Sequence, residues 1–218
     1  MHKKGGFVFL FCIIFFTAFA QKKSRHNDSV VTSAKSMIKE GDVIFRNGNS
    51  KESVLIKSFS VGDSSFSHCG IALKDFYGNI KVYHMLGGHR INNTDLHEDG
   101  FDDFVSDSAN KSFAVFRYKL TTSECNKIKK YIDKLKEEEV KFDYQFSCLS
   151  KDTLYCTEMI VRSIEYATNG RISFELFTRD ISANPVRYFL KRNSLTYYPL
   201  EFLQNNRYII QSYIFHFQ

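Results

Sequence analysis

Two histidines lie on neighbouring predicted strands, at positions from which their side chains can meet. His68 lies at the start of the segment 67–73 and His84 near the end of the segment 80–85, with a turn at 74–79 between them. If the two segments pair as a hairpin, the imidazoles face each other to within a residue or two of register. One ring can then take a proton while the other holds it in the correct tautomer. The pair therefore indicates general acid–base chemistry.

A cysteine opens a predicted helix much later in the chain. Cys156 follows a polar loop, and Met159, Ile160 and Ile164 recur after it at helical spacing. Unpaired N–H groups and the positive end of the helix dipole favour a thiolate at such a position. The same N–H groups can stabilise an oxyanion, so Cys156 fits nucleophilic acyl transfer. The spacing alone does not bring Cys156 to the histidines.

Each of these residues also has a structural interpretation. A strand histidine is commonly a hydrogen-bonded core residue, and a cysteine is commonly a small buried residue or half of a disulfide. The cysteines that follow the N-terminal segment could form two disulfides, and Cys148 is the nearest partner for Cys156. No C-x-x-C or H-x-x-x-H spacing indicates a zinc site. These cysteines are Cys69, Cys125, Cys148 and Cys156.

The first 20 residues have the pattern of a secretory signal peptide. Lys3 and Lys4 supply a positive start, an apolar stretch covers 7–16, and Ala18 and Ala20 are the small residues that a signal peptidase recognises. The apolar stretch is shorter than the roughly 20 residues that span a bilayer. We therefore expect cleavage after Ala20 and an exported protein, periplasmic or extracellular.

The composition is that of a globular protein. The 218 residues are 43% hydrophobic and 25% charged, and 16% are aromatic, which excludes a disordered, solvated chain. The net charge of +6 is scattered rather than gathered into a basic stripe, so nucleic acid is not an expected partner. A membrane surface is compatible with the sequence, but no feature indicates one.

The remaining pattern predicts one α+β domain over 41–218, preceded by a polar and loosely ordered segment at 21–40. A helix capped by Thr122 or Ser123 is expected to extend to about residue 140. His97 lies among Asn and Asp residues and is expected in a loop. Besides the two strands that carry the histidines, short apolar stretches predict strands at 43–45, 113–118 and 208–214.

Five short motifs, taken in order, resemble a known family. They are GDVIF at 41–45, SHCGI at 67–71, VYH at 82–84, FDYQF at 142–146 and YCTE at 155–158. Together they resemble the circularly permuted papain-like cysteine hydrolases of the YiiX type, in the NlpC superfamily. In that family the histidine strand precedes the cysteine helix, and this order marks the permutation. The implied fold is an antiparallel sheet packed against helices.

The resemblance also implies roles for the candidate residues. Cys156 corresponds to the nucleophile, His68 to the general base and His84 to the third member of the site, with no cofactor and no metal. Thr157 stands where the family often has serine, and Phe142 where it often has tyrosine. His84 occupies a position that is often glutamate.

The implied activity is that of an exported cysteine hydrolase, of amidase or endopeptidase type. It would cleave an amide or ester through a thioester on Cys156. Peptidoglycan peptides are the first substrate class, lipid amides or esters the second, and other peptides or glycan-linked amides the third. Three alternatives stay open: an acyltransferase or lipid amide or ester hydrolase on the same fold, a non-catalytic binding module with a decayed site, and metal binding through His68, His84 and Cys156.

Overall fold

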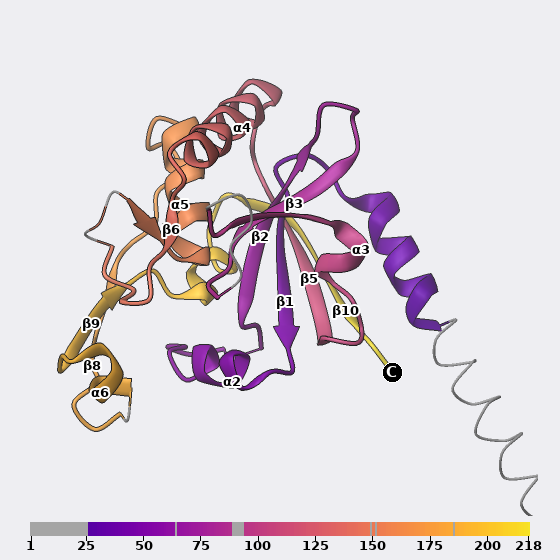
Figure 1. Cartoon of the computed structure of the whole chain (residues 1–218). Helices are drawn as coiled ribbons and strands as arrows, with labels where there is room; N and C mark the ends of the chain where they lie inside the picture. Colours follow the sequence, from indigo (N-terminus) through magenta and orange to yellow (C-terminus); the bar gives the residue numbers. More distant parts are fainter. Residues whose placement is uncertain (1–25, 64, 89–93, 149, 151, 185) are drawn as a thin grey trace, which may run out of the picture.

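The protein is built around a six-stranded sheet. A computed structural model describes residues 26–63, 65–88, 94–148, 150, 152–184 and 186–218. Within them the strand order is β10-β5-β1-β2-β3-β4, and every neighbouring pair is antiparallel (Figure 1). The strands are β1 (Val43–Gly48), β2 (His68–Lys74), β3 (Ile80–Met85), β4 (Leu96–Gly100), β5 (Asn110–Tyr118) and β10 (Ile209–His216).

Shorter elements lie outside this sheet. The helices are α2 (Lys51–Lys57), α3 (Phe101–Phe104), α4 (Thr122–Glu137), α5 (Cys156–Ala167), α6 (Val186–Leu190) and the 3-10 helix η1 (Leu200–Leu203). Two small strand pairs are β6 (Lys141–Phe142) with β7 (Thr153–Leu154), and β8 (Phe177–Asp180) with β9 (Ser194–Tyr197). The class is α+β, with helices packed on an antiparallel sheet, as the sequence predicts.

Both faces of the sheet are buried. Alternation along β1 sends Val43 and Phe45 to one face and Ile44 to the other. The first face packs against α4 and α5, and the second against α3 and the helix over 26–37. Figure 1 shows α4 and α5 on one side of the sheet and the 26–37 helix on the other. The sheet therefore separates two apolar layers, and each side chain of a central strand belongs to one of them.

The expectation of a loosely ordered segment at 21–40 is wrong for its described part, because residues 26–37 form a helix. Val30, Ala34 and Ile38 recur every four residues and pack against the second face of the sheet. The polar residues between them face solvent. Because this apolar stripe is narrow, the segment is polar overall, and its polarity alone does not indicate a helix.

The cap of α4 also differs from the expected residues. Thr121 is the N-cap: its hydroxyl accepts a hydrogen bond from the N–H of Glu124, and its own N–H donates to the Glu124 carboxylate. This reciprocal capping box satisfies two backbone donors at the helix start. Thr122 and Ser123, the predicted caps, are the first two helical residues.

A buried ion pair anchors the start of β1. The carboxylate of Asp42 is fully buried and accepts hydrogen bonds from Nε and Nη2 of Arg117 on β5, at 2.8 and 2.7 Å. It also accepts from the N–H of Lys39 at 2.8 Å. A buried charge is tolerated only when it is paired and hydrogen-bonded. The aspartate of the GDVIF motif therefore links the start of β1 to β5.

Nothing is described of residues 1–25, so the expected signal peptide at 1–20 lies outside the described residues. Among the helices that the structure does describe, none combines the length and the apolar character needed to cross a bilayer.

Candidate functional site

His68, His84 and Asp99 form a hydrogen-bonded chain across β2, β3 and β4. Nε2 of His68 lies 2.9 Å from Nδ1 of His84, and Nε2 of His84 lies 2.9 Å from Oδ2 of Asp99. The expected contact between the two histidines is therefore present. Its register differs from a direct pairing, because β2 and β3 align Ile71 with Tyr83. The two rings meet diagonally, within the two-residue error that the sequence allowed.

Gly70 permits this diagonal approach. A Cβ on Gly70 would lie 2.5 Å from Cγ1 of Val82, 3.0 Å from the carbonyl oxygen of Tyr83 and 3.2 Å from Cβ of His84. A real side chain there would push β3 away from β2. The glycine of the SHCGI motif thus lets the second histidine reach the first.

Replacing Gly70 with alanine is expected to destabilise the fold by about 1–3 kcal/mol, the usual cost of an extra methyl group in a packed interior. Urea unfolding measures the loss. Gly62→Ala is the matched control, because a Cβ there meets nothing within 4 Å. Equal stability of the two variants would contradict the close approach at Gly70.

His97 and Asp99 are site residues that the sequence interpretation missed. The expected loop around His97 is wrong: β4 is a strand, and His97 is the direct cross-strand partner of His84. Their rings stack with centroids 5.4 Å apart. Asp99, two residues further along β4, lies on the same face. The alternation of His97 and Asp99 was the available signal, but Leu96 is the only large apolar residue of this strand.

Burial keeps both imidazoles of the chain neutral. His84 is fully buried, and this lowers its pKa to about 4, although the hydrogen bond to Asp99 acts in the opposite direction. Burial, and then the positive charge of Arg46, lower the pKa of His68 well below its ordinary value. The bond from His84 lowers the pKa of the Asp99 carboxyl. His68 is therefore neutral, and His84 links it to the ionised Asp99. A neutral imidazole is the form that can accept a proton.

Cys156 is the first residue of α5, as the sequence indicates, but its sulfur lies beside Cys69. The sulfur lies 3.9 Å from Oγ1 of Thr157. Alternation along β2 turns His68 and Cys69 to opposite faces of the sheet. Over the described part of the chain, the sulfur makes no hydrogen bond to His68 or His84. The structure thus brings together two of the three predicted site residues, and the roles of all three stay predictions.

Hydrogen-bond donors surround the sulfur and favour the thiolate. The Cys69 thiol, then the Thr157 hydroxyl and the backbone N–H groups of both residues, lower the pKa of Cys156 to about 7, although burial raises it. Burial and the same thiol contact raise the pKa of Cys69 well above its usual value. Of the two adjacent thiols, Cys156 has the lowered pKa and Cys69 the raised one. The N-cap, Tyr155, makes no side-chain capping bond to the first turn of α5.

The two halves of the site meet at β2, where His68 and Cys69 are consecutive. Arg46 is the partner of His68 on β1, and its guanidinium lies 4.6 Å from the ring centre of Phe104. The negative charges of Asp99 and the Cys156 thiolate both favour the charged form of Arg46, although burial lowers its pKa. The half-buried Arg46 therefore interacts with both the imidazole chain and the thiol.

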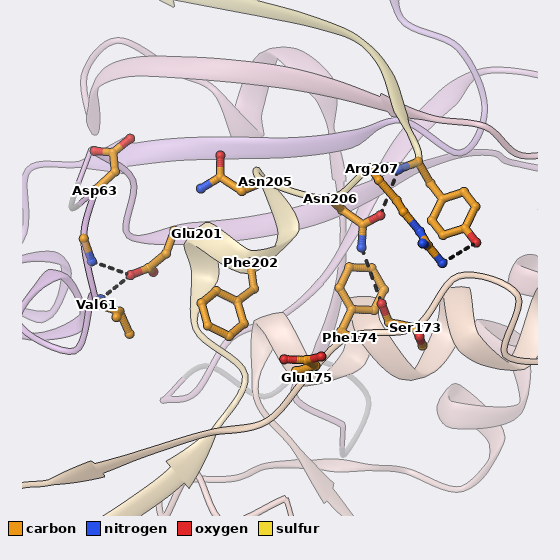
Figure 2. Close-up of a pocket in the computed structure, with 12 residues that line it drawn as sticks. Val61, Asp63, Ser173, Phe174, Glu175, Glu201, Phe202, Asn205, Asn206 and Arg207 are labelled. Carbon is orange, nitrogen blue, oxygen red and sulfur yellow. Dashed lines mark hydrogen bonds between the residues drawn. The ribbon is translucent and has the colours of Figure 1, made fainter.

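Two cavities share the lining residue Glu201, and the smaller of them borders the thiol. The smaller, of about 40 Å³, is lined by Cys156 and by a group of aromatic residues. The larger, of about 720 Å³, lies between the loop 61–63, the segment 173–175 and the chain over 201–208 (Figure 2). Glu201 lines both cavities and accepts hydrogen bonds from the N–H groups of Val61 and Gly62. The aromatic residues of the smaller cavity are Phe59, Phe66, Phe146, Tyr155, Tyr197 and Tyr198.

The four described cysteines are free thiols. Cys148, the partner that the sequence offered for a disulfide with Cys156, instead lies with its sulfur 3.0 Å from the hydroxyl of Tyr155. The disulfide alternative for Cys156 is therefore absent from this structure.

Comparison with known proteins bears on the fold. No family model matches this chain, and no curated protein matches it. Among solved structures, the metalloprotein yiiX from Escherichia coli O157:H7 (DUF1105) superimposes with a TM-score of 0.64 at 16% sequence identity, covering 83% of this chain and 98% of that chain. At this identity the likeness concerns the arrangement of elements and not the chemistry. The chain therefore has a YiiX-like α+β fold.

Proposed function

We propose that this protein is a cysteine hydrolase of amidase or peptidase type, with Cys156 as its nucleophile. The observation that carries the proposal is the state of the thiol. Cys156 begins α5, borders a cavity, and has four hydrogen-bond donors that lower its pKa to about 7. An ordinary buried cysteine has a raised pKa, as Cys125 and Cys148 do. A lowered thiol pKa at a helix N-terminus is typical of nucleophilic cysteines.

The reaction divides into two acyl-transfer steps. The Cys156 sulfur bonds to the carbonyl carbon of an amide or ester, and the thiol proton passes to His68. His68 then gives this proton to the leaving nitrogen or oxygen as its bond to carbon breaks, which leaves a thioester. Water, deprotonated by His68, hydrolyses the thioester and restores the thiol. The N–H groups of the first turn of α5 are the donors available for the oxyanion.

The chain of His84 and Asp99 suits this role of His68. Nε2 of His68 is engaged with His84, so Nδ1 is the atom available to exchange a proton with the thiol. Asp99 holds His84, which in turn holds His68. β2 turns His68, its first residue, to the face opposite Cys69 and the Cys156 sulfur. The proposal therefore requires a movement at this end of β2 that brings the sulfur and Nδ1 of His68 together during turnover. Catalytic hydrogen bonds are often formed only in the substrate complex.

The proposed activity also concerns the family to which the chain is related. We also propose that the chain is related to the permuted papain-like enzymes; the order of the His68 strand before the Cys156 helix and the YiiX-like fold support this proposal. The YiiX protein is described as a metalloprotein. Among the described residues, His84, His97 and Asp99 form a group of side chains that could hold a metal ion, and this group does not include Cys156. If the N-terminal 20 residues direct export, cell-wall peptides are the first substrates to expect.

One observation favours a second substrate class on the same residues. Aromatic side chains dominate the cavity that Cys156 borders. The aromatic lining favours an apolar group over a charged one, and the volume of about 40 Å³ admits only a small group, such as the end of an acyl chain. Hydrolysis of a lipid amide or ester, or transfer of its acyl group to an amine or alcohol, is therefore the second candidate.

Alkylation of the folded protein by iodoacetamide, followed by mass spectrometry over a pH series, tests the state of the thiol. We expect Cys156 to react with a midpoint near pH 7, because its pKa is lowered to about 7. Cys125 and Cys148 are internal controls: burial raises the pKa of each to about 11, so they should react slowly at neutral pH.

The Cys69→Ala variant removes the largest cause of the lowered pKa, so the alkylation midpoint of Cys156 should move to higher pH. Cys69→Ser retains a donor and should move it less. If Cys156 reacts no faster than Cys148 at neutral pH in the unmodified protein, the nucleophile assignment is lost.

A further inference from the structure

His84, His97 and Asp99 form a compact set of donors on one face of β3 and β4. One nitrogen from each histidine and one oxygen from Asp99 lie within 4.8 Å of one another. His84 and His97 are direct cross-strand partners with stacked rings, and Asp99 follows two residues later on the same face. Strand pairing therefore fixes the three donors relative to each other without a flexible loop.

The chemistry of this set matches a transition-metal site. Neutral imidazole nitrogens and an ionised carboxylate are ligands for zinc and related divalent ions, and three protein ligands with an open position form a common arrangement. His84 and His97 are buried, whereas the Asp99 side chain is 32% exposed, which leaves a path from solvent. We propose that His84, His97 and Asp99 bind one divalent transition-metal ion such as zinc.

Metal binding here would change the hydrogen bond between the two catalytic candidates. Without an ion, the Asp99 carboxylate accepts a hydrogen bond from Nε2–H of His84, so Nδ1 of His84 must accept a hydrogen bond from Nε2–H of His68. The proton of His68 is then on Nε2, and its Nδ1 is free to act as a base. When an ion takes Nε2 of His84, the His84 proton moves to Nδ1 and donates to His68.

The consequence for His68 is a change of tautomer. With Nε2 of His68 now accepting, its own proton must lie on Nδ1, the atom that the thiol reaction needs as a base. An ion at the far end of the chain would therefore inhibit the proposed hydrolase. This second step rests on the proposed function, whereas the metal site does not.

Zinc titration of the purified protein by calorimetry tests the site itself. We expect one equivalent to bind. His97→Gln and Asp99→Asn should each weaken binding at least about tenfold, a loss that is typical even when an outer partner of a metal ligand is removed. Asp102→Asn is the matched control, since Asp102 is a nearby exposed carboxylate paired with Lys35, and it should leave the affinity unchanged.

Cobalt spectra of the loaded protein give a readout that does not depend on activity or on variant folding. A site of two imidazoles and a carboxylate gives ligand-field bands without thiolate-to-cobalt charge transfer. Thiolate charge transfer, retained zinc affinity in both ligand variants, or loss of zinc binding in Cys156→Ala would overturn the site.

Inhibition is measured separately, on whichever substrate the unmodified protein cleaves. Zinc should reduce that turnover, and His97→Gln should abolish the sensitivity. Zinc binding with unaltered turnover would overturn the tautomer step alone. An inactive protein that still binds one zinc ion would count against the hydrolase and not against the metal site.

Discussion

Replacing Cys156 with alanine is expected to remove hydrolysis almost completely, by at least about 10⁴-fold in kcat, since loss of a nucleophile in comparable enzymes costs up to about 10⁶-fold. The fold should survive, because the side chain borders a cavity and its truncation removes one sulfur atom. Turnover of amide and ester substrates measures the loss, and far-UV circular dichroism checks the fold.

Cys125→Ala is the control for this experiment. Cys125 is also a buried free thiol, but it lies on α4 and its sulfur is near the carbonyl of Glu40. Its removal should leave kcat unchanged. If Cys156→Ala retained the full rate, the reaction would not proceed through this thiol, and the assignment of Cys156 as the nucleophile would fail.

Replacing Asp42 with alanine is expected to lower the free energy of unfolding by about 3–5 kcal/mol, more than the other substitutions proposed for this protein. The reason is that Arg117 would keep a charge at a largely buried position after losing both of its carboxylate contacts. The N–H of Lys39 would lose its acceptor as well. The free energy of unfolding in urea measures the effect.

Asp102→Ala provides the comparison, because Asp102 pairs with Lys35 and both side chains are 55% exposed. Exposed pairs contribute between zero and about 1 kcal/mol. A loss in Asp42→Ala no greater than in Asp102→Ala would show that the ion pair does not anchor β1. In that case the aspartate of the GDVIF motif would need another explanation.

Much of the sheet could be predicted because its central strands are apolar on both sides. The predicted bounds of β3 agree with the structure, and β2 and the helix of Cys156 begin within a residue of where the sequence indicates. The contact between His68 and His84 followed from a short turn and the two-residue period of strands. These are local signals, which a single sequence contains.

The remainder depends on partners distant in the chain. β4 is polar in most positions, and it is a strand because β3 pairs with it, so His97 and Asp99 were not recognised. The face that Cys156 occupies is set by how α5 packs on β2 and β3. The sequence of residues 155–158 does not indicate how α5 packs. Strand propensity depends on such neighbours more than helix propensity does.

The alternation at the start of β2 has a consequence for how this protein tolerates changes in length. One peptide bond separates the imidazole of His68 from the thiol of Cys69, and pairing with β1 fixes which of them faces which layer. With the rest of β2 held in register, an insertion or deletion of one residue between Cys69 and Gly70 would exchange the faces of the two groups, and an insertion between His68 and Cys69 would put both on one face. The turn after β2 is free of that constraint, because Phe76 and Tyr77 are 91% and 84% exposed. Variation in length should therefore accumulate at that turn and be absent from the four residues at 67–70.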